Sequence, residues 1–155
     1  RLSLVGSEMC IRDRIELSDL NILVKMYIET FNAGPWNDEW TVETASRRLT
    51  QMIKCPDSYG LLAYVDNVPA GMILGAEEQY YNGLMFNIKE FCINNQLRGK
   101  GLGTSIYEEF EKRLKEKGIR EIILLTSPGP QTEGFYHKRG FETSKGMIMM
   151  GKLIG

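Results

Sequence analysis

The stretch that decides the fold is QLRGKGLGT, residues 96–104, with glycines at positions 99, 101 and 103. The apolar run before it, residues 85–93, predicts a strand, and residues 104–117 after it predict a helix. Glycines let the backbone approach a ligand closely, and the N–H groups of such a turn, with the positive end of the helix, attract an anion. Arg98 and Lys100 add positive charge. We therefore predict that this turn binds phosphate or pyrophosphate.

Two common phosphate-binding motifs do not fit this spacing. A Walker loop needs G-x-x-x-x-G-K-[ST], but Thr104 follows Gly103 where a lysine should stand. A dinucleotide fingerprint needs G-x-G-x-x-G, whereas these glycines read G-x-G-x-G. The spacing disfavours a nucleotide-binding protein, and a plain glycine-rich turn remains the simpler alternative.

The elements around the turn predict an α/β domain with a mixed sheet. Apolar stripes with helical spacing follow Ser18 and Thr41, each of which can cap a helix. Asp66-Asn67 and Asn82-Gly83 predict hairpin turns between strands. The expected order is two helices, three strands, a helix, a strand, a short helix and one or two last strands, at residues 18–31, 41–53, 59–65, 69–78, 85–93, 104–117, 119–125, 132–139 and 141–153.

Composition excludes several classes of protein. The chain has 155 residues, a net charge of −1 and 43% hydrophobic residues, which are ordinary values for one globular domain. It lacks the basic surplus of a nucleic-acid-binding protein and an apolar run of about 18 residues that could span a membrane. Three cysteines without metal-ligand spacing predict reduced thiols in a cytoplasmic protein. A single histidine, His137, disfavours a metal site or a Ser-His-Asp triad, and we expect no metal.

Residues 1–14, RLSLVGSEMCIRDR, stand apart from the rest. They contain no apolar core long enough for a secretion signal. They resemble one reading frame of a sequencing adapter, so we interpret them as non-native and assign residues 15–155 to a single domain. The alternative is a genuine first strand.

Two motifs together resemble the GNAT N-acetyltransferases. The glycine turn fits the family's Q/R-x-x-G-x-G/A acyl-CoA signature twice, once from Gln96 and once from Arg98. FYHKRGF, residues 135–141, resembles the family's late Tyr-x-x-x-Gly-Phe element. The resemblance covers about residues 15–153. It implies a mostly antiparallel central sheet flanked by helices, in the order (β)ααβββαβαβ.

The resemblance implies acetyl-CoA as the acyl donor. In the family, the backbone of the glycine turn holds the pyrophosphate, a role that carries over to Arg98, Gly99, Lys100, Gly101, Leu102, Gly103 and Thr104. The end of the preceding strand pairs with the pantetheine arm, which carries over to Phe91, Cys92 and Ile93. Core packing is the alternative for these apolar side chains, although both roles are compatible. The chain departs from the family at Gly129, where an asparagine often contacts the cofactor; Thr126 or Ser127 could substitute.

The resemblance also assigns catalytic roles. Tyr136 matches the family tyrosine near the thioester sulfur, where a phenol can protonate the leaving thiolate. Glu90 is the one carboxylate in an otherwise apolar strand, so we expect its pKa to be raised and expect it, or a water that it orients, to take the proton of the amine. The alternatives are a tyrosine packed on the sheet, and a glutamate facing solvent or paired with Lys89 or Lys100. Without a histidine base, Cys92 reads as a small buried residue rather than a nucleophile.

The loop between the first two helices, Trp36-Asn37-Asp38-Glu39-Trp40, is the expected acceptor site. Aromatic rings and carboxylates can surround a cationic amine, and Tyr80 could join them from the next hairpin. We therefore assign Trp36, Asp38, Glu39 and Tyr80 to substrate binding. The loop is similar to that of aminoglycoside-type acetyltransferases. A solvated loop with its tryptophans anchored in the core is the alternative.

The function implied is transfer of an acetyl group from acetyl-CoA to a primary amine by direct attack in a ternary complex. The amine could belong to a small molecule, such as an aminoglycoside, or to a peptide. A homodimer is expected only as a general tendency of soluble proteins. The alternative function is a non-catalytic acyl-CoA-binding or sensing module on the same fold.

Overall fold

The computed structural model describes residues 2–4 and 7–155, with side chains from Glu8 onward. The chain divides into two units, Arg1–Leu124 and Leu125–Gly155, which are described separately. Among the described residues, no helix is both long and apolar enough to cross a membrane.

The first unit is built on one six-stranded sheet whose strand order follows the sequence. Neighbouring strands are antiparallel except β5 and β6, which are parallel. A mixed sheet flanked by helices was predicted and is confirmed. The strands are β1 (Leu2–Leu4), β2 (Ser7–Asp13), β3 (Ser58–Val65), β4 (Val68–Tyr80), β5 (Gly83–Ile93) and β6 (Ile119–Leu124).

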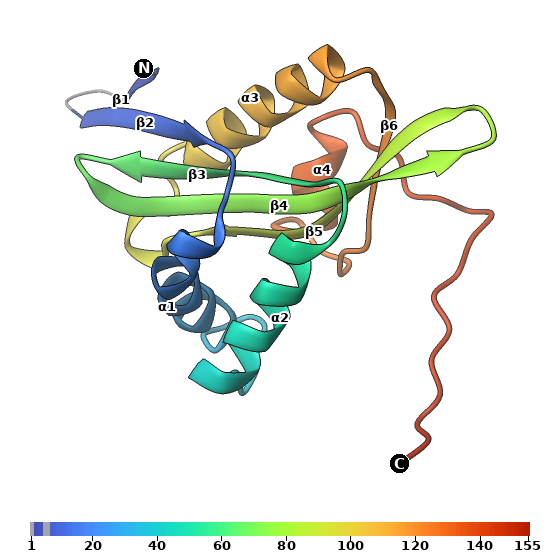
Figure 1. Ribbon diagram of the computed structural model, residues 1–155, viewed down its shortest axis with the longest axis horizontal. Helices are drawn as coiled ribbons and strands as arrows, with labels where there is room; N and C mark the ends of the chain where they lie inside the picture. The colour runs from blue at the N-terminus through green and yellow to red at the C-terminus, as the bar shows by residue number, and fades with distance from the viewer. Residues whose placement is uncertain (1, 5–6) are drawn as a thin grey trace. The chain divides into compact units, whose positions relative to one another are not determined.

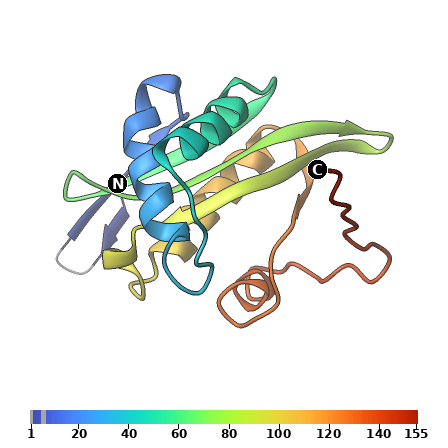
Figure 2. The same cartoon turned by 90° about the horizontal axis from the view of Figure 1, so that it is seen from below.

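Helices cover both faces of this sheet. Helices α1 (Leu20–Phe31) and α2 (Val42–Lys54) lie side by side on one face, and α3 (Leu102–Glu116) lies on the other (Figures 1 and 2). Two 3-10 turns, η1 (Leu17–Asp19) and η2 (Asn95–Leu97), precede α1 and follow β5. The core under α1 and α2 includes the fully buried Leu23, Leu49, Leu62 and Met72.

The hairpin and helix signals of the sequence are confirmed. Asp66 and Asn67 both adopt positive φ, as a tight hairpin between β3 and β4 requires. Residues 7–13, which we interpret as non-native, form β2 and pair with β3 from Met9 to Asp13. Main-chain pairing carries no information on where a sequence comes from, so that interpretation stays a prediction.

The second unit differs from expectation at its end. It contains the short helix α4 (Glu133–His137), but residues 141–155 form neither helix nor strand. Six large apolar side chains there are exposed, those of Met147, Ile148, Met149, Met150, Leu153 and Ile154. Their apolar pattern suits a strand, but a strand also needs a neighbour to complete its main-chain hydrogen bonds, and the local pattern cannot supply one.

A β-bulge in β5 reverses which face of the sheet the side chains after it occupy. Leu74 of β4 pairs with Glu90, but its neighbour Gly75 pairs with Ile88, so Lys89 is an extra residue in β5. In an unbroken strand Phe86 and Glu90 would share a face. Instead Phe86 packs on Phe110 of α3, while Glu90 reaches the α1 side of the sheet.

Gly75 permits this close approach of the two strands. A Cβ at position 75 would lie 2.1 Å from the carbonyl oxygen of Asn87. Only a residue without a side chain fits so near to backbone.

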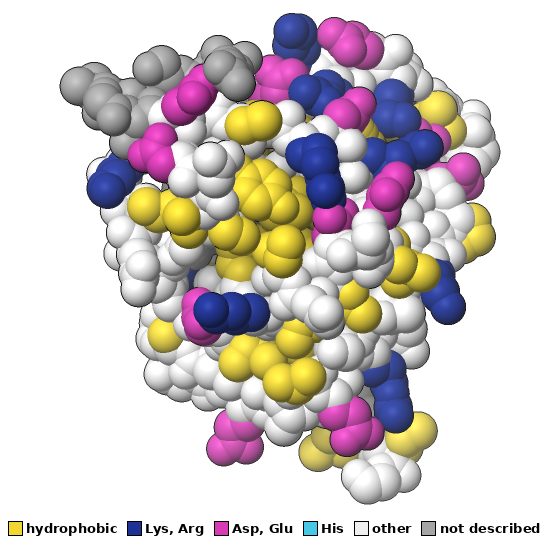
Figure 3. Space-filling view, turned by 60° about the vertical axis from the view of Figure 1, so that its left-hand side comes forward, with side chains coloured by type: hydrophobic (Ala, Val, Ile, Leu, Met, Phe, Trp, Pro, Cys, Tyr) yellow, Lys and Arg dark blue, Asp and Glu magenta, His cyan; other side chains and the backbone are white. Residues whose placement is uncertain are grey.

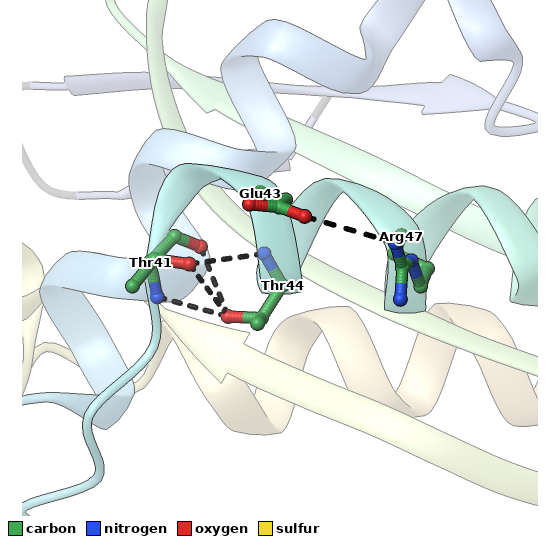
Figure 4. Close-up of polar contacts among 4 residues, drawn as sticks. All are labelled: Thr41, Glu43, Thr44 and Arg47. Atoms are coloured by element: carbon green, nitrogen blue, oxygen red, sulfur yellow. Dashed lines mark hydrogen bonds and ion pairs between the residues drawn. The ribbon is translucent and has the colours of Figure 1, made fainter.

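Thr41 should contribute measurably to stability as the N-cap of α2. Its Oγ1 accepts from the Thr44 amide at 3.1 Å, and Thr44 Oγ1 accepts from the Thr41 amide at 3.0 Å (Figure 4). We expect Thr41→Ala to lower the free energy of unfolding by about 1 kcal/mol in urea denaturation, because the amide of Thr44 loses its acceptor.

Arg47→Ala is the matched control on the same helix. Its pair with Glu43 is exposed and 3.7 Å long, so its loss should cost no more than about 0.5 kcal/mol. Equal effects of the two substitutions would contradict the capping role.

Candidate active site

The glycine turn has the geometry of an anion site. Gly99 and Gly101 adopt φ of +78° and +75°, a region that favours glycine, and Gly101 is the N-cap of α3. A Cβ at either position would meet nothing within 4 Å, so the turn borders open space. The first amides of a helix have no carbonyl one turn earlier to bind, and with the helix dipole they attract anions. The residues therefore fit a pyrophosphate group.

Next to this turn, β5 extends beyond the end of its neighbour β6. Strand β6 pairs with β5 only from Leu84 to Ile88, whereas β5 continues to Ile93. The residues assigned to the pantetheine arm, Phe91, Cys92 and Ile93, lie in this extension. A strand that extends past its neighbour offers main-chain groups to an extended ligand.

Glu90 is buried among two polar partners. It is 7% exposed, and its Oε1 accepts from Tyr27 Oη at 3.0 Å and from Arg48 Nε at 2.6 Å. Burial raises the pKa of Glu90, and the hydrogen bond and charge of Arg48 oppose the rise. The expected pKa direction is thus found, but the lysine partners considered from the sequence are replaced by Arg48 and Tyr27.

Sequence reasoning missed these two partners. Tyr27 belongs to the apolar stripe that predicts the helix after Ser18, and Arg48 lies beside the stripe of α2, with a 41% exposed side chain. The one available signal was Glu90 itself, because a buried carboxylate requires a cation or hydrogen-bond donors from the facing helices.

The loop expected to bind the acceptor, Trp36–Trp40, contacts both partners of Glu90 and the glycine turn. The ring of Trp40 lies 5.1 Å from that of Tyr27, and the Arg48 guanidinium lies over Trp40 at 5.9 Å. At the other end of the loop, the Arg98 guanidinium lies over the Trp36 ring at 5.2 Å. The structure therefore brings Trp36 next to a residue predicted to bind the cofactor.

The other substrate-binding assignments are placed differently. Asp38 accepts from Trp40 Nε1 at 3.1 Å and is exposed, as is Glu39. Tyr80 is 52% exposed at the hairpin end of β4, against Tyr81. It stands six residues beyond Leu74, about 20 Å along the strand at the usual rise per residue. The strand therefore carries Tyr80 away from the level of Glu90.

Tyr136 belongs to the second unit, on α4. Its ring lies 5.2 Å from Phe135 and 5.3 Å from Phe141, and its carbonyl accepts from the Phe141 amide. Its neighbour His137 is exposed and bonds through Nε2 to Thr143. The catalytic role of Tyr136 stays a prediction.

The thiol of Cys92 is buried and does not act as a nucleophile. It is 3% exposed, and burial raises the pKa of its thiol to about 12. The side chain therefore stays protonated near neutral pH, which fits a packing residue rather than a nucleophile. Within the described residues, no group of three or more His, Cys, Asp or Glu side chains could hold a metal ion.

On the face drawn in Figure 3, the surface charges are mixed rather than segregated. Lys and Arg side chains lie beside Asp and Glu side chains there. Such mixing suits the net charge of −1 and gives this face no continuous basic stripe for a nucleic-acid backbone.

Comparisons with known proteins find similarity to acetyltransferases. A protein of Bacillus subtilis (strain 168), whose name marks it as a candidate acetyltransferase, is 32% identical over 94 residues. The match covers 61% of this chain, and the chain spans about 60% of that relative's length.

Solved structures share the fold. A possible acetyltransferase of Clostridium difficile 630 superposes with a TM-score of 0.79 at 12% identity, covering 95% of this chain and 99% of the other. An aminoglycoside N-acetyltransferase in complex with CoA gives a TM-score of 0.71 at 19% identity, covering 97% and 99%.

A family model also matches most of the chain. The family model for the acetyltransferase (GNAT) domain matches residues 21–150, a range that includes the glycine turn, Glu90 and Tyr136. The chain therefore belongs to the GNAT acetyltransferase family.

Proposed function

We propose that this protein is an N-acetyltransferase that moves an acetyl group from acetyl-CoA to a primary amine. The observation that carries the proposal is the open glycine turn at the start of α3, beside the end of β5 that extends beyond β6. One part can hold a pyrophosphate through backbone amides, and the other can hold an extended arm. The CoA complex of the structurally similar aminoglycoside N-acetyltransferase supports this choice of donor.

The reaction requires two proton transfers. Acetyl-CoA supplies an acetyl group activated as a thioester; the amine nitrogen bonds to its carbonyl carbon and the carbon–sulfur bond breaks. We assign to Tyr136 the proton given to the departing thiolate. We assign to Glu90, directly or through water, the proton that the amine sheds. Both known contacts of Glu90 engage Oε1, so Oε2 is the accepting oxygen in this proposal.

The acceptor is proposed to be a cationic amine bound at the loop Trp36–Trp40. Asp38 and Glu39 are exposed there and supply negative charge. Trp36 and Trp40 already contact Arg98 and Arg48, so the amine would use the remaining faces of these indoles. An aminoglycoside-like amine or a peptide amine fits this description. We also propose a cytoplasmic location, because the two cysteines outside residues 1–14, Cys55 and Cys92, are free thiols.

One observation favours the alternative of a non-catalytic acyl-CoA-binding module. Glu90 is held by Arg48 and Tyr27 in an arrangement that a purely structural ion pair would share. That module would bind acetyl-CoA but transfer nothing to any amine.

Isothermal titration with acetyl-CoA tests the proposed donor. We expect binding at or below about 1 mM, weakened about tenfold by Arg98→Ala, because a charge-assisted hydrogen bond to phosphate is lost. Lys112→Ala is the control; its residue lies on α3 about ten residues, or 15 Å, from the glycine turn. No heat at millimolar acetyl-CoA would exclude the proposal.

Turnover separates the enzyme from the binding module. With acetyl-CoA and a panel of amines, release of free thiol should be detectable, and Tyr136→Phe and Glu90→Gln should each lower kcat by about 100-fold or more. Tyr81→Phe, at an 89% exposed ring, should change nothing. If transfer occurs and both variants retain full kcat, the assigned proton transfers are wrong.

The raised pKa of Glu90 predicts a pH-dependent stability. Between its ordinary pKa of 4.5 and its raised pKa in the folded protein, the unfolded chain loses the Glu90 proton while the folded protein retains it. Stability from this group is therefore fullest below pH 4.5 and is lost as pH rises through the folded-state pKa, above which Glu90 is ionised. The free energy of unfolding of the protein, minus that of Glu90→Gln, should therefore fall from pH 4.5 upward in urea denaturation. A difference that grows with pH would show that the pair with Arg48 outweighs burial.

A further inference from the structure

We propose that Trp36 is a positioning residue for Arg98, and that this contact couples the acceptor loop to the cofactor turn. The inference rests on the proposed function, because it takes the turn at residues 98–104 as the pyrophosphate site. It adds a role for the tryptophan at the other side of the active site. The two residues lie 62 positions apart in the chain and belong to segments with different expected ligands.

The Arg98 guanidinium is anchored by the indole rather than by a carboxylate. Its Cζ lies over the Trp36 ring, 5.2 Å from the centroid. Within residues 8–155, where side chains are described, Arg98 forms no ion pair. A guanidinium above a ring keeps its N–H donors at its own edge, where phosphate oxygens can accept from them.

Trp36 is itself held by the helix layer. Its ring meets Phe31 of α1 at 5.1 Å in an edge-to-face arrangement, and Phe31 meets Tyr27 at 4.7 Å. Tyr27 donates to Glu90. A continuous row of contacts thus runs from the proposed proton acceptor, through α1, to the proposed phosphate ligand.

The coupling between CoA binding and the position of Trp36 is reciprocal. If the Trp36 ring favours the Arg98 position that binds pyrophosphate, then bound CoA must favour the same position of Trp36. Because Trp36 begins the acceptor loop, CoA binding would hold that loop in place for the amine. The pairing of an acceptor-side indole with a cofactor-side cation therefore links the two binding events.

The other tryptophan of the loop provides a comparison. Trp40, at the other end of the loop, carries a different guanidinium, that of Arg48, at 5.9 Å. It offers the same chemistry without contact to the cofactor turn. Trp36 and Trp40 are also the only two tryptophans in the chain, so fluorescence can report on one when the other is replaced.

A double-mutant cycle measured by titration with CoA tests the coupling. We expect Trp36→Leu, which keeps an apolar contact for Phe31 but removes the aromatic face, to weaken CoA binding about 2- to 5-fold. In the Arg98→Ala background the same substitution should have no effect. Trp36→Phe should restore most of the affinity, and Lys112→Ala, on α3 about ten residues from the glycine turn, should leave it unchanged. In Trp40→Phe protein, CoA should alter the emission of Trp36.

The outcomes separate the two proposals. If the unaltered protein does not bind CoA, the proposed function and this inference both fail. If CoA binds and Arg98→Ala weakens it, but Trp36→Leu has no effect or adds fully to Arg98→Ala, the inference alone is overturned. Trp36→Phe retains a ring and serves as the folding control for the leucine variant.

Discussion

The single extra residue in β5, Lys89, is the constraint on which the site depends. It lies unpaired between Ile88 and Glu90, which pair with Gly75 and Leu74, and at Gly75 the strands approach too closely for any Cβ. Without it, the alternation of side chains would place Glu90 with Phe86 on the α3 face, inside an apolar layer. With it, Glu90 and Cys92 turn toward α1 and α2. The same point along β5 is where β6 stops running beside it, after Ile88. The local irregularity therefore sets the face of the carboxylate, and it coincides with the start of the open strand end.

Placing a carboxylate on that face carries an energetic cost that the helices must offset. An ionised glutamate at 7% exposure loses most of its hydration. Arg48 from α2 and Tyr27 from α1 replace that water with two hydrogen bonds to one oxygen. Removing one partner would leave a buried charge unpaired, which costs about 3–5 kcal/mol in other proteins. The pair thus fixes where both helices stand over the sheet, whatever chemistry Glu90 performs.

Features governed by neighbours in sequence could be predicted. The cap at Thr41, the hairpin at Asp66-Asn67 and the start of α3 after the glycine turn all follow from a few adjacent residues. The fold followed from the order of such elements together with the resemblance carried by the glycine turn. The bulge could not be predicted, because it shows itself only when Gly75 is set against Asn87 across two strands. The prediction of a strand in residues 141–153 was wrong for a related reason. Residues 147–154 have a strand's composition, but composition does not provide a pairing partner.

The candidate site likewise has one part that could be predicted from the sequence and one part that could not. The glycine turn was recognisable because backbone amides, glycines and a helix start are consecutive in the chain. The partners of Glu90 lie 42 and 63 residues away from it, and no periodicity connects them. The contact between Trp36 and Arg98 spans a similar separation. The sequence separately predicted an acidic, aromatic loop and a cationic turn for two different ligands, but only the fold places an indole of one beneath the guanidinium of the other. Because the contact uses the face of the ring and leaves the edge of the guanidinium for another partner, the proposed cofactor and acceptor regions would touch without competing for the same donors.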